Sequence, residues 1–235
     1  MQKDIRITSK DGKTFGGYIA YPETDHKMPG VIVIQEIFGV NANVISVCEN
    51  LAQAGYIALA PDLFWRQKPG VVLDDKIEAD WKDAFQYFNG FDVDLGIEDL
   101  KSTLTFLRKD KKCTGSVGTL GYCLGGKLAY LMGTRSDADC NVSYYGVGIQ
   151  DLLGEAKNIK KPFFLHVAEN DEYVPIAAQK KIMQALNDLD GVEVDVYPNV
   201  DHAFARVGGA HYDKEAAHQA NYRTADFLAT CLTPQ

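Results

Sequence analysis

Apolar and polar positions divide the chain into short apolar runs and longer stretches in which apolar residues recur at helical spacing. The short runs predict six strands, the first three of them buried on both faces; they cover 31–34, 56–60, 116–120, 142–145, 162–167 and 192–197. The helical spacing predicts helices over 43–54, 74–91, 94–108, 176–189 and 214–230, and another that starts at Lys127. Alternation over 4–8 and 14–21 predicts an antiparallel hairpin on a sheet edge.

Strands that alternate with helices are typical of a mostly parallel sheet with helices on both faces. No internal repeat, low-complexity tract or long linker interrupts the alternation. We therefore expect an α/β fold with a single domain over residues 1–235. Asn41 or Asn43 is expected to cap the helix over 43–54, and Gly55 to end it.

The stretch Gly121-Tyr122-Cys123-Leu124-Gly125-Gly126 joins a predicted strand to a predicted helix. Strand, Gly-x-nucleophile-x-Gly and helix form the nucleophile-elbow pattern, in which glycines let two backbones approach closely. The turn would place Cys123 at the positive end of the helix dipole, where a thiol ionises more easily. A cysteine between glycines is also often a small buried residue, so the motif alone does not decide between the two interpretations.

Four polar residues follow predicted strands: Glu36, Cys123, Asp171 and His202. The carboxyl ends of strands in an open α/β sheet form one ligand-binding edge, and the order nucleophile, acid, histidine is that of α/β hydrolases. We predict that Cys123 attacks a carbonyl carbon, that His202 transfers the proton with a pKa near working pH, and that Asp171 orients the imidazole. Taken alone, Asp171 could be a turn former and His202 an exposed loop histidine.

The oxyanion of a tetrahedral intermediate needs two hydrogen-bond donors. We expect one from the backbone N–H of Leu124, the residue after the nucleophile, and the other from Ile37. Three aromatic residues, Trp81, Phe85 and Phe88, share one face of the helix predicted over 74–91. They are either core packing or the lining of a pocket.

Composition and charge narrow the class of protein. The chain has 235 residues and a net charge of −8, which argues against the clustered basic surface that binds nucleic acid. No stretch approaches the roughly 18 apolar residues of a membrane span, and 1–4 show no apolar core of a signal peptide. The five cysteines match no metal site or disulfide framework, so we expect no metal and a reducing cytoplasm.

Five motifs carry a closer resemblance: Gln-Glu-Ile-Phe-Gly-Val-Asn at 35–41, Pro-Asp-Leu at 61–63, the elbow at 121–126, Tyr-Tyr-Gly at 144–146 and His-Ala-Phe-Ala-Arg at 202–206. Through them the chain resembles the dienelactone hydrolase (carboxymethylenebutenolidase) family over nearly its whole length. The resemblance implies an α/β hydrolase that is monomeric, cytoplasmic and without a cofactor. It also implies hydrolysis of a small unsaturated lactone bearing a carboxylate to maleylacetate, in chloroaromatic breakdown.

The resemblance implies a role for Glu36 that the residues alone do not. In the resting family enzyme this carboxylate pairs with the thiol and keeps it neutral, and substrate binding moves it so that the thiol loses its proton. A carboxylate beside a developing thiolate is unfavourable unless it takes the proton, which agrees with that role. From the residues alone, Glu36 could equally be a strand-end carboxylate in water.

The chain departs from the family pattern where the substrate carboxylate binds. Two arginines, a tyrosine and a serine hold that carboxylate in the family, and Arg206 matches one of the arginines. Trp81, Phe85 and Ala203 stand at the other three positions. A buried carboxylate needs charge-assisted partners, so we expect a more apolar pocket that favours neutral esters or lactones, or a larger substrate. Two further residues, Phe38 and Tyr145, are expected to line it.

The leading prediction is therefore a cysteine hydrolase of a small lactone or ester, without a nucleic-acid or membrane partner. One alternative is a carboxylesterase of broader range that acts on neutral esters. A protease is a weaker candidate, because no signal of an extended peptide groove is seen. A non-catalytic binding protein on the same fold would more often have lost a triad residue, and none is missing.

Overall fold

The computed structural model describes residues 5–232, which group into two compact units, 5–119 and 120–232. Each unit has its own strands and helices and is described by itself. The expectation of a single domain over residues 1–235 stays a prediction, and its first four and last three residues lie outside the described part, as does Asp4 of the predicted hairpin.

The first unit holds a sheet with the strand order β3-β5-β4-β6. Its strands are β3 (Gly17–Ala20), β4 (Met28–Ile34), β5 (Ile57–Pro61) and β6 (Cys113–Tyr122), the last of which continues into the second unit. Strand β5 runs parallel to β4, and β3 is the antiparallel edge strand. Both β4 and β5 are buried along almost their whole length, which agrees with continuous apolar runs between two helical layers.

The predicted edge hairpin is partly wrong. Strands β1 (Ile7–Thr8) and β2 (Thr14–Phe15) form a separate two-stranded antiparallel sheet, and only β3 joins the larger one. The second arm of the hairpin divides at Gly16 and Gly17. A Cβ on Gly17 would lie 2.4 Å from the carbonyl oxygen of Ala60, so glycine is what allows β3 to approach β5 closely at this point.

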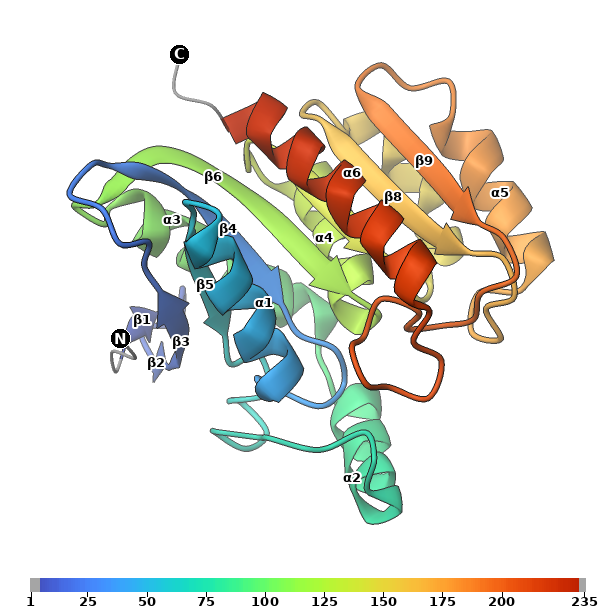
Figure 1. Cartoon of the computed structure of the whole chain (residues 1–235). Helices are drawn as coiled ribbons and strands as arrows, with labels where there is room; N and C mark the ends of the chain where they lie inside the picture. Colours follow the sequence, from blue (N-terminus) through green and yellow to red (C-terminus); the bar gives the residue numbers. More distant parts are fainter. Residues whose placement is uncertain (1–4, 233–235) are drawn as a thin grey trace. The chain divides into compact units, whose positions relative to one another are not determined.

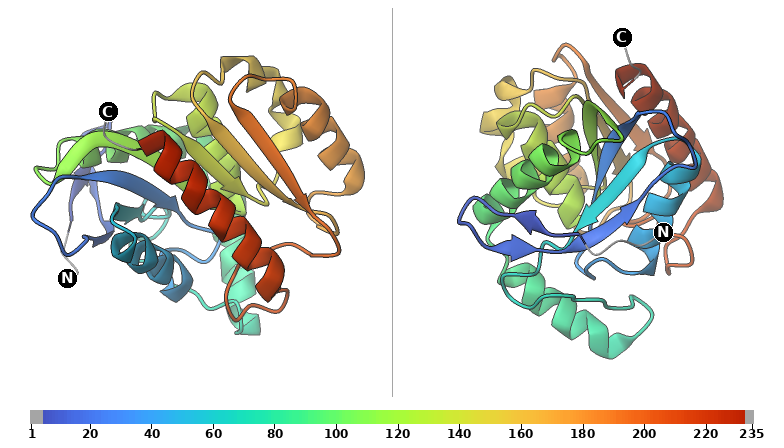
Figure 2. Two further views of the ribbon diagram at one scale, coloured as in Figure 1. Left: turned by 45° about the horizontal axis from the view of Figure 1, so that its top comes forward. Right: turned by 90° about the vertical axis from the view of Figure 1, so that its left-hand side faces the viewer.

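Helices cover both faces of the first sheet. Helix α1 (Ala42–Gln53) and helix α3 (Val93–Arg108) lie on opposite sides of β4 and β5 (Figure 1; Figure 2, right). Of the two predicted caps, Asn41 is the one that caps α1, because its side chain accepts a hydrogen bond from the Val44 N–H. Gly55, with φ +94°, follows its end.

Helix α2 (Glu78–Asn89) is shorter than the helix predicted over 74–91. The Asp80 carboxylate accepts the N–H of Asp74, and the Ile77 N–H donates to the Asp74 carbonyl oxygen. These bonds close a turn ahead of the helix, so the charged residues before Glu78 do not extend it. Hydrophobic spacing alone does not contain this side-chain competition for the backbone.

The second unit continues from the end of β6 with three parallel strands in the order β7-β8-β9. They are β7 (Asn141–Tyr144), β8 (Phe163–Ala168) and β9 (Val192–Tyr197). Helix α6 (Lys214–Leu232) lies in front of β8 in Figure 1, and helix α4 (Leu124–Arg135) packs against β7 from behind. Helix α5 (Ile176–Leu186) lies beside β9.

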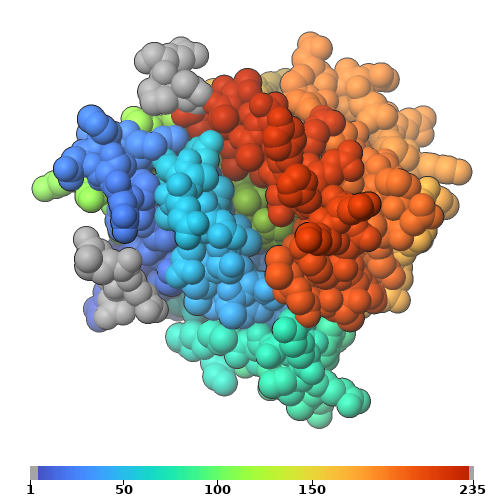
Figure 3. Space-filling model, in the orientation of Figure 1, coloured from blue at the N-terminus to red at the C-terminus, as the bar shows by residue number. Residues whose placement is uncertain are grey.

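Connections in the second unit also shape its surface. Two short 3-10 helices that periodicity does not predict, η1 (Ile149–Asp151) and η2 (Leu153–Asn158), join β7 to β8. The loop between β9 and α6 and the helix itself form a continuous red surface on the face shown in Figure 3. The fold is thus α/β, with mostly parallel strands between helices, as the alternation predicts.

Within residues 5–232, every helix is too short or too polar to cross a membrane.

Candidate active site

The elbow at 121–126 has the geometry that its glycines predict. Strand β6 ends at Tyr122, helix α4 begins at Leu124, and Cys123 between them has φ 56° and ψ −114°. A positive φ is uncommon for a residue with a Cβ and marks a strained turn. The Cys123 N–H donates to the Tyr144 carbonyl oxygen at 3.0 Å, which fixes the turn against β7.

Two glycines make this turn possible. A Cβ on Gly121 would lie 2.0 Å from the carbonyl oxygen of Gly125, and one on Gly126 would lie 2.6 Å from that of Tyr144. Cys123 is half-buried and stands at the N-terminus of α4. The first-turn N–H groups of a helix have no partner within the helix, so this end favours a negative charge.

The loop after β8 holds the Asp171 carboxylate from two sides. Asp171 Oδ1 accepts the main-chain N–H groups of Tyr173 at 2.8 Å and Val174 at 3.2 Å. Its Oδ2 accepts the Nδ1–H of His202 at 2.8 Å. The carboxylate is buried and fully engaged, so it cannot easily turn away from the imidazole.

His202 completes the cluster from the loop after β9. Its imidazole also hydrogen-bonds to the Cys123 sulfur, and its side chain is almost entirely buried. The Asp201 carboxylate accepts the His202 main-chain N–H at 2.6 Å, and His211 Nδ1 donates to the His202 carbonyl oxygen at 3.2 Å. The second unit therefore brings together three residues that are far apart in sequence.

The electrostatics of His202 differ from the prediction. Burial by itself would lower the pKa of His202, but the Cys123 sulfur and the Asp171 carboxylate outweigh it and raise the pKa to about 10. The sulfur and the carboxylate thus both favour the protonated form of the imidazole. The prediction of a pKa near working pH was wrong, because spacing along a sequence does not contain the charges that meet in the fold.

Two tyrosine rings contact the imidazole, and the sequence singled out only one of them. The Tyr145 ring lies 5.0 Å from it between centroids, at 63°, and Tyr145 is held at φ 38°. The Tyr173 ring lies 4.8 Å away, at 73°. Tyr173 is 39% exposed and follows Asp171 by two residues, which is the one signal that could have indicated it.

The first unit holds the other predicted site residues. Glu36 and Ile37 are buried just after β4. Phe38 packs edge-on against Trp81 of α2 at 5.0 Å, and Trp81 lies 5.9 Å from Phe85. These three rings form an aromatic cluster, defined by Phe38, Trp81 and Phe85, in which Phe85 is 39% exposed.

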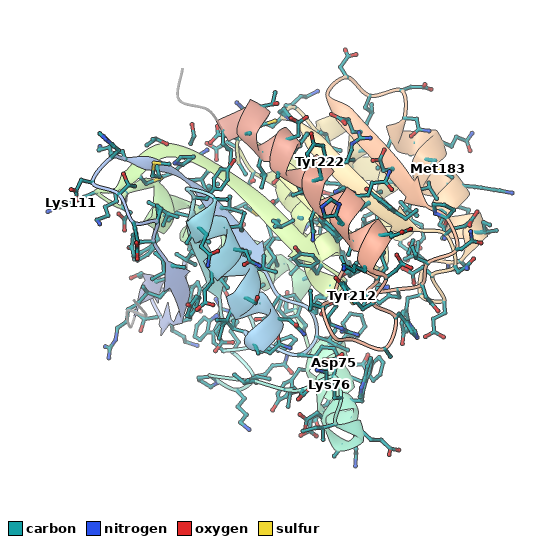
Figure 4. The ribbon with its side chains drawn as sticks, in the orientation of Figure 1. Asp75, Lys76, Lys111, Met183, Tyr212 and Tyr222 are labelled. Carbon is teal, nitrogen blue, oxygen red and sulfur yellow. The ribbon has the colours of Figure 1, made fainter. Side chains whose placement is uncertain are left out.

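Trp81 is held in that cluster by its indole N–H, which donates to the Asp75 carbonyl oxygen at 2.8 Å. Asp75 and the neighbouring Lys76 are labelled ahead of α2 in Figure 4.

Arg206 and Ala203 lie in the loop between β9 and α6, on which Tyr212 is labelled in Figure 4. Ala203 is buried and has φ 64°. Arg206 is half-buried, and its main-chain N–H donates to the Ala203 carbonyl oxygen at 2.9 Å.

The remaining histidines and cysteines have other surroundings. His166 is fully buried and hydrogen-bonds to Tyr197 and Thr224, as expected of a core histidine. Cys48 and Cys140 are buried in the core. Over residues 5–232, no three His, Cys, Asp or Glu side chains are grouped so that they could hold a metal ion.

Comparison with known proteins gives a consistent result. A protein of Azospirillum brasilense that carries the provisional name carboxymethylenebutenolidase is 45% identical over 226 residues, covering 96% of this chain and 97% of its own. The carboxymethylenebutenolidase of Pseudomonas putida is 36% identical, covering 97% of each chain.

Among solved structures, a provisionally assigned dienelactone hydrolase of Klebsiella pneumoniae is 27% identical, with a TM-score of 0.86 over 97% of this chain and 98% of its own. An esterase of Pyrococcus furiosus is 17% identical, with a TM-score of 0.71 over 98% of this chain and 93% of its own, and shows the same fold. The model of the dienelactone hydrolase family matches residues 15–232. The chain therefore belongs to the dienelactone hydrolase family of α/β hydrolases, and its class of activity is carboxylic ester hydrolysis.

Proposed function

We propose that the protein hydrolyses a small lactone or ester with Cys123 as the nucleophile, His202 as the proton donor and acceptor, and Asp171 as the group that orients His202. One observation carries the proposal: Cys123, at a strained position on a helix N-terminus, hydrogen-bonds to an imidazole that Asp171 holds at 2.8 Å. Nucleophile, base and orienting carboxylate are the parts that covalent acyl transfer needs.

In the proposed first step, Cys123 is a thiolate and His202 is protonated. The Cys123 thiolate attacks the carbonyl carbon, and the carbonyl electron pair moves to oxygen. When the tetrahedral intermediate collapses, the bond to the leaving oxygen breaks and that oxygen takes the proton of His202, which leaves a thioester on Cys123. Neutral His202 then removes a proton from water, whose oxygen attacks the thioester, and the carboxylic acid leaves while thiolate and imidazolium are restored.

The oxyanion of both intermediates needs donors that are fixed before the reaction. The main-chain N–H of Leu124, in the first turn of α4, is our candidate for one of them. Ile37 is our candidate for the second, by resemblance to the family. We assign Glu36, also by resemblance, the control of the Cys123 proton before substrate binds.

The names of the relatives support a lactone substrate of the dienelactone type. The side chains of this chain favour a less charged one. Aromatic rings stand at Trp81 and Phe85, and a methyl group at Ala203, whereas Arg206 is the one remaining match to the groups that bind a carboxylate in the family. We therefore propose a more apolar pocket, with Phe38 and Tyr145 as further lining residues, and a broader carboxylesterase as the second candidate function.

The test is hydrolysis of cis- and trans-dienelactone and of p-nitrophenyl acetate by the wild type and by Cys123→Ala. We expect the substitution to lower kcat/KM on every accepted substrate by about 10³-fold or more, because no thioester can form. Cys48→Ala, which changes a fully buried thiol, is the matched control and should keep the activity.

Alkylation by iodoacetamide gives a second measurement on the same variants. Cys123 should react selectively, and a change of its rate when ligand binds would support the role of Glu36. Unchanged hydrolysis by Cys123→Ala, or equal reactivity of all five thiols with and without ligand, would contradict the proposal and favour a binding protein on this fold.

A further inference from the structure

We propose that Tyr173 is a positioning residue, which holds the His202 imidazole in its productive orientation toward Cys123 and shields it from water. The proposal rests on the proposed function, since it takes Cys123, His202 and Asp171 as the reacting groups. Tyr173 has no place in the sequence pattern of the triad, and its role follows from its contacts.

The main chain of Tyr173 is already part of the support of Asp171. Its N–H donates to Asp171 Oδ1 at 2.8 Å, beside the bond from Val174 at 3.2 Å. Because Oδ1 accepts both bonds, Oδ2 faces the imidazole and accepts its Nδ1–H. The backbone that fixes Asp171 therefore also fixes the ring of Tyr173 next to His202.

The side chain of Tyr173 contacts the imidazole and is itself partly exposed to solvent. Its ring stands nearly perpendicular to the imidazole, with the centroids 4.8 Å apart. Tyr145, the other ring in contact, is buried and packs at 5.6 Å against Phe204. Tyr173 is 39% exposed, whereas His202 is 7% exposed, so Tyr173 is the contact through which water would enter if the ring were removed.

Several charged or titratable groups of the second unit surround His202, and each has its own contact. Cys123 and Asp171 bond to the imidazole, Asp201 accepts the His202 main-chain N–H, and His211 donates to the His202 carbonyl oxygen. The Glu172 side chain hydrogen-bonds to Tyr173. Against this set, the ring of Tyr173 adds an aromatic surface, which attracts a cation and keeps the local dielectric low.

Two opposing contributions to the pKa of His202 decide in which direction it moves when the Tyr173 ring is removed. Burial lowers the pKa of His202, and the attraction of Cys123 and Asp171 raises it by more, to about 10 from an ordinary value of 6.5. Water that enters the site weakens both contributions. Because the attraction is the larger, removal of the Tyr173 ring should move the pKa of His202 back toward its ordinary value.

Two variants separate the ring from the rest of the side chain: Tyr173→Leu removes it, and Tyr173→Phe keeps it. With Tyr173→Leu we expect kcat on p-nitrophenyl acetate to fall about fivefold to tenfold, with KM changed by less than about twofold. The pKa of His202, followed by NMR of protein labelled with ¹⁵N-histidine, should fall by about half a pH unit or more. Tyr173→Phe should match the wild type in both measurements.

Tyr222→Leu is the control, because Tyr222 is 71% exposed on α6, where Figure 4 labels it. A wild-type kcat and His202 titration in Tyr173→Leu would overturn the proposal, and so would an equal loss in Tyr173→Phe. If Tyr173→Leu does not fold, Tyr173→Met makes the same comparison with Tyr173→Phe. Failure of the proposed function has a different signature, which is undiminished hydrolysis by Cys123→Ala.

Discussion

At the scale of single residues, the site depends on places where a side chain is missing. Gly121 and Gly126 leave room for backbone atoms that a Cβ would meet at 2.0 and 2.6 Å. The strained Cys123 lies between them, with its φ of 56°. Positive φ values also occur at Tyr145 and Ala203, both next to or against His202. Unfavourable backbone conformations are thus concentrated around the reacting groups, as is common at active sites.

Gly126→Ala tests this dependence. We expect it to lower the free energy of unfolding by about 2 kcal/mol or more, and to reduce kcat, because the neighbouring backbone of Tyr144 must move and carries the bond to the Cys123 N–H. Gly133→Ala is a matched control in the same helix, since its Cβ would have no neighbour closer than 3.5 Å. It should be neutral or stabilise by up to about 1 kcal/mol. Urea unfolding and esterase assays distinguish the two, and equal behaviour would contradict the argument.

At the scale of elements, α2 carries two of the three rings of the aromatic cluster. Its acidic first turn, Glu78 and Asp80, precedes Trp81, whose ring lies against Phe38 while Phe85 stays 39% exposed. The helix therefore presents aromatic surface at the two positions where the resemblance to the family implies an arginine and a tyrosine. Selectivity against a carboxylate would then reside in this one short helix.

Trp81→Arg introduces the arginine that the resemblance to the family implies at this position. We expect the ratio of kcat/KM for the anionic dienelactone to that for a neutral ester of similar size to rise about tenfold, because a charge-assisted bond to the carboxylate becomes possible. Trp81→Leu, which removes the indole and its bond to Asp75 without adding charge, should leave the ratio unchanged. A wild-type enzyme that already prefers the anion strongly would show that Arg206 suffices and that the apolar pocket is wrong.

The elements show what a sequence pattern contains. Buried strands such as β4 and β5 are predictable, since an apolar run between turns has few other solutions. The start of α2 is not, because the Asp80 side chain in its first turn accepts the main-chain N–H of Asp74 ahead of it. The division of the hairpin at Gly16 and Gly17 is also not predictable from the pattern, because it depends on how closely β3 approaches Ala60 of another strand.

At the scale of the whole molecule, a buried polar network makes folding sensitive to acid. His166 Nδ1 lies 2.9 Å from the Tyr197 hydroxyl, and its Nε2 lies 2.8 Å from the Thr224 hydroxyl, which links β8, β9 and α6. Burial, with a smaller effect of the Arg223 charge, lowers the pKa of His166 to about 3. Below about pH 6.5, His166 therefore binds a proton in the unfolded chain but stays neutral in the folded protein. The free energy of unfolding falls as the pH drops through this range.

Urea unfolding from pH 7 to pH 4 measures this effect. His166 alone should lower the free energy of unfolding by about 1.4 kcal/mol per pH unit below about pH 6.5. His166→Gln removes the titrating ring, so it should be less stable than the wild type at pH 7 and lose less stability on acidification. Parallel pH curves for the two proteins would show that His166 does not control the acid transition.

For the candidate site, too, the sequence predicts some features and not others. Cys123, Asp171 and His202 can be found from the sequence, because each follows a strand and parallel strands end at one edge. The Tyr173 contact and the raised pKa of His202 cannot, because they arise from rings and charges that only the fold brings to within about 5 Å of each other.

The boundary between the two compact units falls between Thr119 and Leu120, shortly before the elbow. Every residue of the proposed acyl-transfer machinery, apart from Ile37 and Glu36, is encoded after that boundary, whereas Phe38, Trp81 and Phe85 are encoded before it. A gene recombined at this junction would inherit Cys123, Asp171 and His202 from one parent, and Glu36, Ile37 and the aromatic cluster from the other. The boundary is therefore a natural crossover point for family shuffling, at which the aromatic cluster can be exchanged while Cys123, Asp171 and His202 stay together.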